Sequence, residues 1–141
     1  ETHIVPLAID AARQGNTFKI FGDKYPTEDG TCVRDYVHVM DLADAHIKAL
    51  NYASENLTSE VFNLGSGAPA SNKQLLETVQ KHTGKMNIEI WGNRPGDPAY
   101  LVADINKVKE VLGWEPKQSS IDNVVSTAVK WYNTIHKKQI Q

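Results

Sequence analysis

The sequence contains a single cysteine, Cys32, and no long apolar run. One thiol cannot close an internal disulfide, which excludes a disulfide-stapled secreted domain and favours a reducing, cytoplasmic location. No stretch approaches the roughly 18 apolar residues that a membrane-spanning helix needs. A signal-peptide pattern is lacking as well, which agrees with a cytoplasmic protein.

An excess of charge of either sign is also missing. The 15 Lys and Arg residues nearly balance the 17 Asp and Glu residues, and the formal net charge is −2. Without a basic field, no long-range attraction would hold a polyanion, so we expect neither a nucleic acid nor a membrane as partner. Internal repeats and low-complexity segments are absent from the sequence.

The residues that are present suffice for one hydrophobic core. Apolar residues make up 40% of the 141-residue chain, and a chain of this size buries about two-thirds of its unfolded surface. We therefore expect residues 1–141 to form a single domain. The chain begins at Glu1 rather than Met and runs directly into an apolar pattern, so we expect it to be part of a longer protein.

Hydrophobic periodicity and turn residues predict a mixed α/β fold with four strands and five helices. The strands are expected at Thr17–Phe21, Val33–Val37, Glu60–Leu64 and Asn87–Trp91. The helices are expected from Ile4 to a cap at Gly15, from a cap at Asp41, from Ser71 with a capping box to Gln74, from a cap at Asp104 to Gly113, and from Ile121 to Ile135.

A glycine-rich turn connects the third strand to the third helix. Gly65, Gly67 and Ala70 match the G-x-G-x-x-G/A pattern of dinucleotide-binding loops, in which backbone amides receive a pyrophosphate. However, Pro69 supplies no amide donor, and Ser71 already caps the helix. We therefore interpret the segment as a tight structural turn and expect no cofactor-binding residues in it.

Two arginines are the strongest candidates for binding an anion. Arg34 lies in an expected strand just after a turn, and Arg94 lies in a loop rich in Gly and Pro. A guanidinium on ordered backbone suits bidentate recognition of phosphate oxygens. The alternative is that both are surface arginines paired with Asp35 and Asp97. Asp97 could accept hydrogen bonds from ribose hydroxyls or simply serve the turn.

The remaining polar and aromatic candidates favour structural roles. On one helix, Asp41 and Asp44 share a face that His46 does not, so we expect no metal site. Cys32 is expected to be a small buried apolar residue. Three tryptophans are expected to pack in the core or on its flank: Trp91, Trp114 and Trp131.

Four segments resemble a known family. The block Tyr25–His46 strongly resembles the UDP-glucose 4-epimerases, also called UDP-galactose 4-epimerases, of the extended short-chain dehydrogenase/reductase superfamily. Asn63–Gly67 and Arg94–Ala99 match in the same order, and the last segment matches at its start, Ala103 and Asp104, and at its end, Leu112, Gly113 and Trp114. The first block is highly specific, whereas Asn63–Gly67 is shared by many relatives. The resemblance implies the C-terminal, sugar-nucleotide-binding domain of an NAD(P)-binding, Rossmann-type enzyme.

The resemblance also implies that the catalytic and NAD-binding residues lie in an N-terminal Rossmann domain that this sequence does not contain. The family's catalytic Tyr-x-x-x-Lys pair is missing, since none of the five tyrosines is followed by a lysine at that spacing. We expect no catalytic residue here, no activity of this chain alone, and an apolar surface that the NAD domain would cover.

Residue roles follow from the resemblance position by position. Arg34 and Arg94 would bind the UDP pyrophosphate, Asp97 would bind the uridine ribose, and Tyr36 would lie beside the diphosphate. Four further residues complete the expected site: Phe18, Phe21 and the backbone of Lys19 would border the uracil and ribose, and Leu101 would lie near the C2 substituent of the sugar.

The implied activity of the full-length enzyme is the interconversion of UDP-galactose and UDP-glucose through a 4-keto intermediate with bound NAD. Its implied partners are the UDP-sugar, its own Rossmann domain and a second copy in a homodimer. Two alternatives stay open. One is a UDP-N-acetylglucosamine 4-epimerase or a related NAD-dependent epimerase or dehydratase. The other is a stand-alone UDP-binding module without catalysis.

Overall fold

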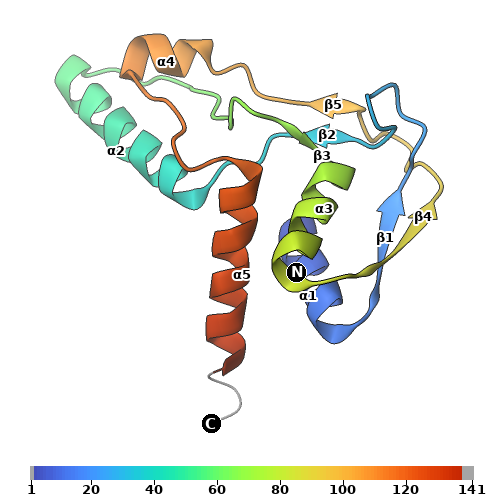
Figure 1. Cartoon of the computed structure of the whole chain (residues 1–141). Helices are drawn as coiled ribbons and strands as arrows, with labels where there is room; N and C mark the ends of the chain where they lie inside the picture. Colours follow the sequence, from blue (N-terminus) through green and yellow to red (C-terminus); the bar gives the residue numbers. More distant parts are fainter. Residues whose placement is uncertain (1, 138–141) are drawn as a thin grey trace.

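The computed structural model describes residues 2–137. The elements follow one another along the chain as α1 (Ile4–Gln14), β1 (Thr17–Phe21), β2 (Val33–Arg34), α2 (Val39–Asn56), β3 (Ala70–Ser71), α3 (Asn72–Thr83), β4 (Asn87–Trp91), β5 (Tyr100–Leu101), α4 (Asn106–Leu112) and α5 (Ile121–Lys137). Figure 1 shows α2 and α4 at one end of the molecule, and α1, α3, β1 and β4 at the other.

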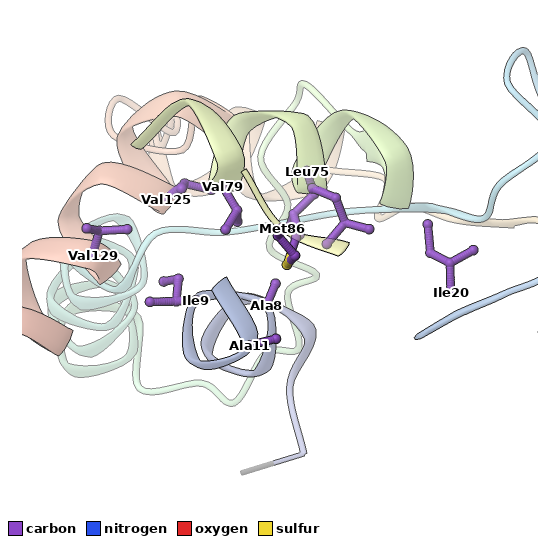
Figure 2. Close-up of a cluster of buried hydrophobic side chains, with 10 residues drawn as sticks. Ala8, Ile9, Ala11, Ile20, Leu75, Val79, Met86, Val125 and Val129 are labelled. Atoms are coloured by element: carbon purple, nitrogen blue, oxygen red, sulfur yellow. The ribbon is translucent and has the colours of Figure 1, made fainter. Parts of the chain in front are cut away.

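The larger hydrophobic cluster joins α1, α3 and α5 to β1. The apolar faces of the three helices meet there because each repeats its apolar residues at helical spacing. Figure 2 shows the buried side chains converging between these helices. They are Ala8, Ile9, Ala11, Ile20, Leu75, Leu76, Val79, Met86, Val125 and Val129. The parallel pairing of β1 with β4 places Phe21 directly opposite Trp91.

A smaller cluster holds α2 against α4. It consists of Ala45, Ile105, Val108 and Trp114, of which Trp114 is fully buried. The Trp114 indole N–H donates to the carbonyl of Asp41 at 3.0 Å, so the buried ring has no unpaired donor.

A short three-stranded sheet lies between the two clusters, in the order β3-β2-β5. Strand β2 pairs antiparallel with β3 and parallel with β5, which sets Arg34 between Ala70 and Leu101. The sheet therefore brings segments 33–34, 70–71 and 100–101 together.

Several predicted elements are confirmed. The strands Thr17–Phe21 and Asn87–Trp91 have the expected bounds. Ser71 caps α3, and the capping box with Gln74 is formed in both directions. The first and fourth helices end at Gly15 and Gly113, both in the left-handed conformation that favours glycine.

Other predictions were wrong. The segment Glu60–Leu64 is not a strand, because Lys107 of α4 bonds the Glu60 carboxylate at 2.6 Å and the Val61 carbonyl at 3.0 Å, and no neighbouring strand pairs with it among residues 2–137. The second strand covers Val33–Arg34 only. The two-residue strands β3 and β5 were not predicted.

Two expected caps also differ. The N-cap of α2 is His38, whose Nδ1 accepts from the Met40 amide at 3.1 Å. Asp41 lies inside the helix instead, since its carboxylate is buried among donors of segment 117–119. The N-cap of α4 is Ile105, although the Asp104 carboxylate does accept from the Asn106 amide at 2.9 Å.

Candidate functional site

A cleft of about 770 Å³ runs between α1, β1, β2 and the loop that follows β4. Seven of the eight residues predicted for nucleotide binding line it: Phe18, Lys19, Phe21, Arg34, Tyr36, Arg94 and Asp97. These residues come from segments far apart in the sequence. Leu101 does not line the cleft. It lies on β5, next to Arg34 in the strand register, and 61% of its surface is exposed.

Arg34 is held in place by backbone carbonyls at the floor of the cleft. Its Nη1 donates to the carbonyl of Val33 at 2.9 Å and to the carbonyl of Pro98 at 2.8 Å. Its Nη2 lies 3.9 Å from the Asp97 carboxylate, the outer limit of an ion pair. The guanidinium is thus oriented before any ligand arrives, and it ties β2 to the loop 92–99.

The Arg94 guanidinium lies over an aromatic ring. Its guanidinium carbon is 3.6 Å from the centroid of Phe21. A guanidinium over a ring face still has its in-plane N–H groups, which can donate to an anion. Within residues 2–137, neither an ion pair nor a side-chain hydrogen bond of the Arg94 guanidinium is found.

The alternative that both arginines pair with surface carboxylates holds only for Arg34 and Asp97, whose ion pair is long. Asp35 accepts from the backbone amides of Ser66 at 2.6 Å and Ala103 at 3.1 Å instead of binding an arginine. Asp97 approaches Arg34 only at 3.9 Å. Both arginines line the cleft, and within residues 2–137 each guanidinium keeps N–H groups that donate to no protein acceptor.

The loop between Arg94 and Asp97 is a tight turn. The Asp97 amide donates to the Arg94 carbonyl at 3.3 Å, and Gly96 has a φ of +87°. Pro followed by a left-handed Gly is the arrangement that type II turns favour. The turn interpretation of Asp97 is therefore correct, and the turn also directs Arg94 and Asp97 into one cleft.

Tyr36 contributes a neutral hydroxyl at the side of the cleft. It donates to the Asn72 side-chain oxygen at 3.2 Å. Burial raises the pKa of Tyr36 to about 12, although the charge of Arg34 acts in the opposite direction. Asn72 lines the cleft as well and was not predicted, since nothing in its local sequence distinguishes it from an ordinary first residue of a helix.

The glycine turn 65–70 does not fit the pyrophosphate of a dinucleotide. The Ser66 amide donates to Asp35, and the Ala68 amide donates to the Ser66 hydroxyl at 3.0 Å. A Cβ added to Gly65 would meet the other oxygen of the Asp35 carboxylate. A carboxylate so close would repel a phosphate, so this turn serves the fold.

No group of three or more His, Cys, Asp or Glu side chains in the range of residues 2–137 is placed to hold a metal ion. None of the helices in the same range is both long and apolar enough to cross a membrane.

The chain belongs to the GDP-mannose 4,6 dehydratase family, whose model matches residues 1–127. Among curated proteins it is 46% identical over 134 residues to the UDP-glucose 4-epimerase of Lacticaseibacillus casei. That alignment covers 94% of this chain and 40% of the relative. The resemblance found in the sequence motifs is thereby confirmed.

Two solved structures show the same arrangement of elements. The UDP-glucose 4-epimerase of Brucella ovis in complex with NAD has a TM-score of 0.88 at 36% identity, over 94% of this chain and 41% of its own. The UDP-glucose 4-epimerase of Stenotrophomonas maltophila, with bound NAD and formylated UDP-arabinopyranose, has a TM-score of 0.92 at 31% identity, over 98% of this chain and 41% of its own. The predicted fold class is confirmed, and the match falls on the C-terminal portions of these enzymes.

The chain thus spans about two-fifths of the length of the proteins that it matches. The activity of those longer proteins does not transfer to this chain as a finding.

Proposed function

We propose that this chain is the UDP-sugar-binding part of a UDP-glucose 4-epimerase, and that its cleft holds the nucleotide. The observation that carries the proposal is the convergence of Arg34, Arg94 and Asp97 on one cleft from separate segments. Two of these residues are cations whose donors face a common space, as a doubly charged diphosphate requires. The family membership and the epimerase relatives support the same ligand class.

The diphosphate lies between the two guanidinium groups in this proposal. Arg34 uses one nitrogen on backbone carbonyls and offers the others, and Arg94 offers its in-plane edge. Charge-assisted hydrogen bonds of this kind contribute about 1.5–3 kcal/mol each. Asp97, at the end of the turn, accepts from the ribose hydroxyls.

The uracil lies against β1. Phe18 and Phe21 supply apolar surface, and the backbone of Lys19 supplies a donor and an acceptor at the wall of the cleft. Tyr36 stands beside the diphosphate as a neutral hydroxyl, since its pKa is raised to about 12 by burial. For Leu101 to lie near the C2 substituent of the sugar, the sugar must extend out of the cleft toward β5.

The redox chemistry belongs to the full-length protein, which we infer to be an NAD-dependent, cytoplasmic homodimer. NAD would take up and return the hydride of the sugar C4 carbon. This chain's role is to bind the nucleotide. The binding energy of the nucleotide, which is distant from the reacting sugar carbon, then orients the sugar. We infer that the N-terminal Rossmann domain binds the cofactor, because the turn 65–70 does not fit a pyrophosphate.

The surface of α2 is our proposed contact for that Rossmann domain. Helix α2 and the segment after it expose large apolar side chains: Val39, Met40, Ile47, Leu50, Leu57 and Val61. Apolar surface gathered on one helix is typical of an interface rather than of a solvated face. A second domain of the same polypeptide would cover it.

Calorimetric titration of the 141-residue chain with UDP tests the binding proposal. We expect saturable binding that weakens as salt is added, because dissolved ions screen the attraction between the two arginines and the negatively charged diphosphate. Arg34→Ala should weaken UDP about tenfold or more, since a charge-assisted hydrogen bond is lost. Arg13→Ala removes the same charge from the exposed face of α1 and should leave the affinity unchanged.

Uridine serves as the second ligand in the same titration. It lacks the diphosphate, so its weaker binding should not respond to Arg34→Ala. Equal losses of UDP affinity in the Arg34 and Arg13 variants would mean that the two arginines of the cleft act only through nonspecific charge, and would refute the proposal.

An epimerisation assay with the N-terminal domain added tests the alternative of a stand-alone binding module. Epimerisation in that mixture would exclude the alternative.

A further inference from the structure

Trp91 is a large aromatic residue that belongs neither to the hydrophobic core nor to the lining of the cleft. It ends β4, 44% of its surface is exposed, and it belongs to neither buried cluster. It does not line the cleft, although Arg94 and Asp97 of the following loop do. Trp114, by contrast, is fully buried in the smaller cluster.

Four side chains form a continuous row: three come from β1 and β4, and the fourth comes from the loop after β4. The Lys19 ammonium lies 3.8 Å from the centroid of Trp91. Trp91 meets Phe21 edge to face, with centroids 6.0 Å apart and planes at 69°. The Arg94 guanidinium covers Phe21 at 3.6 Å. We call Lys19, Trp91, Phe21 and Arg94 the aromatic row.

The strand register explains why these residues meet. Lys19 and Phe21 are two positions apart on β1 and share a face. Phe21 pairs with Trp91 across the parallel ladder. Arg94 follows Trp91 by three residues, so the loop folds its guanidinium back over the Phe21 ring. The row therefore links the end of the sheet to the candidate anion site.

The physics of the row favours a fixed orientation of Arg94. Ring faces carry negative charge density and ring edges positive, which favours the edge-to-face pair and the cation on each outer side. Trp91 limits the rotation of Phe21, and Phe21 provides the surface on which Arg94 lies. The Lys19 ammonium lies over Trp91 on the side of the row opposite to Arg94.

We propose that Trp91 is a positioning residue: it acts through Phe21 to hold the Arg94 guanidinium flat, with its N–H edge toward the cleft. The identity of the ligand rests on the proposed function. The orientation of Arg94 does not, because it can be measured in the ligand-free chain.

The orientation is tested by NMR of the arginine Nε–Hε groups in the 141-residue chain without ligand. A guanidinium over a ring face experiences a ring current, so the Arg94 resonance should lie upfield of the Arg13 resonance. Trp91→Ala should move it toward the Arg13 position, and Trp91→Phe should preserve most of the shift. Trp131→Ala, at an exposed tryptophan of α5, should change nothing. An unchanged Arg94 resonance in Trp91→Ala would overturn the inference.

A double-mutant cycle with UDP tests the consequence for binding. Trp91→Ala should weaken UDP about threefold to tenfold, and Trp91→Phe should restore much of the loss. If Trp91 acts through Arg94, Trp91→Ala should have no further effect in the Arg94→Ala background. Equal losses in both backgrounds would overturn the positioning role.

These measurements test the proposed nucleotide site and the positioning role of Trp91 separately. If Arg94→Ala leaves UDP affinity unchanged, the proposed nucleotide site is wrong, and the ligand-free spectrum still decides the orientation of Arg94. If Arg94→Ala weakens UDP but Trp91→Ala does not, the nucleotide site stands and the positioning role of Trp91 is wrong.

Discussion

Asp41 is buried in the first turn of α2, and its carboxylate accepts three hydrogen bonds from the segment after Trp114. The donors are the amides of Lys117 at 3.0 Å and Gln118 at 2.9 Å, and the hydroxyl of Ser119 at 2.5 Å. Burial alone would raise the pKa of Asp41, but these hydrogen bonds outweigh it and hold the pKa below its ordinary value. The carboxylate thus fastens α2 to the start of α5.

Asp41→Asn should therefore destabilise the chain by about 2–3 kcal/mol at pH 7, because the amide puts a donor where three donors already point. The folded-state pKa lies below the unfolded value, so the stabilisation is complete above about pH 4 and is lost as pH falls through the folded pKa. Urea unfolding at pH 7 and pH 3 measures the free energy of unfolding. The loss of unfolding free energy in Asp41→Asn should be smaller at pH 3 than at pH 7. Asp44→Asn, at an exposed position of the same helix, should behave like the parent at both pH values. A deficit that does not depend on pH would contradict this role.

Some residues of the site could be predicted from the sequence, and others could not. Arg34, Arg94 and Asp97 stand in recognisable motifs, and the turn chemistry of Pro95 and Gly96 can be read locally. The Pro98 carbonyl that fixes Arg34 lies 64 residues away in sequence, and no local pattern encodes such a contact. Asn72 was missed for the same reason, since its partner Tyr36 is 36 residues away.

At the scale of elements, the loop after β4 depends on the turn after β1. The Gly22 amide donates to the Trp91 carbonyl at 2.9 Å, and Gly22 has a φ of +93°. A Cβ at Gly22 would meet the side chains of Asn93 and Tyr25. The loop that carries Arg94 therefore sits closely against a position that only glycine fits.

Gly22→Ala should displace this loop and weaken UDP about tenfold or more, since a shift of the arginine costs its hydrogen bonds. Gly84→Ala is the matched control: Gly84 has a φ of +99°, but no atom lies within 4 Å of an added Cβ. Both variants should lose stability through backbone strain, and Gly22→Ala alone should lose affinity. Calorimetric titration beside thermal unfolding separates the two effects. Equal affinities of both variants would show that the loop tolerates the added methyl group.

Elements with their own periodicity and caps could be predicted, and those that depend on a distant partner could not. Alternating residues in Thr17–Phe21 and Asn87–Trp91 suffice to indicate strands, and Ser71 with Gln74 marks a helix start. Glu60–Leu64 has strand propensity too, but a strand also needs a neighbour, and Lys107 binds this segment to α4 instead. β3 and β5 span two residues each, too few for a pattern.

At the scale of the whole molecule, the apolar face of α2 sets the behaviour of the chain in solution. Ile47 and Leu50 are 61% and 70% exposed, which is unusual for adjacent turns of one helix. We expect the chain to self-associate as concentration rises. Replacing both with Glu should lower the association constant about tenfold or more, since burying one Leu contributes about 1.5–3 kcal/mol. Sedimentation velocity measures this, with Trp131→Glu as the control for an added charge on α5. A monomer at every concentration would contradict the expectation.

The central claim is that the cleft between β1, β2 and the loop after β4 binds the nucleotide of a UDP-sugar. Its most direct test is an NMR titration of the 141-residue chain with UDP-glucose at low and moderate salt. The account predicts saturable, salt-weakened amide shifts that cluster at Phe21, Arg34, Arg94 and Asp97, disappear in Arg34→Ala and persist in Arg13→Ala. Shifts centred on the glycine turn 65–70, or no saturable shifts at all, would contradict it.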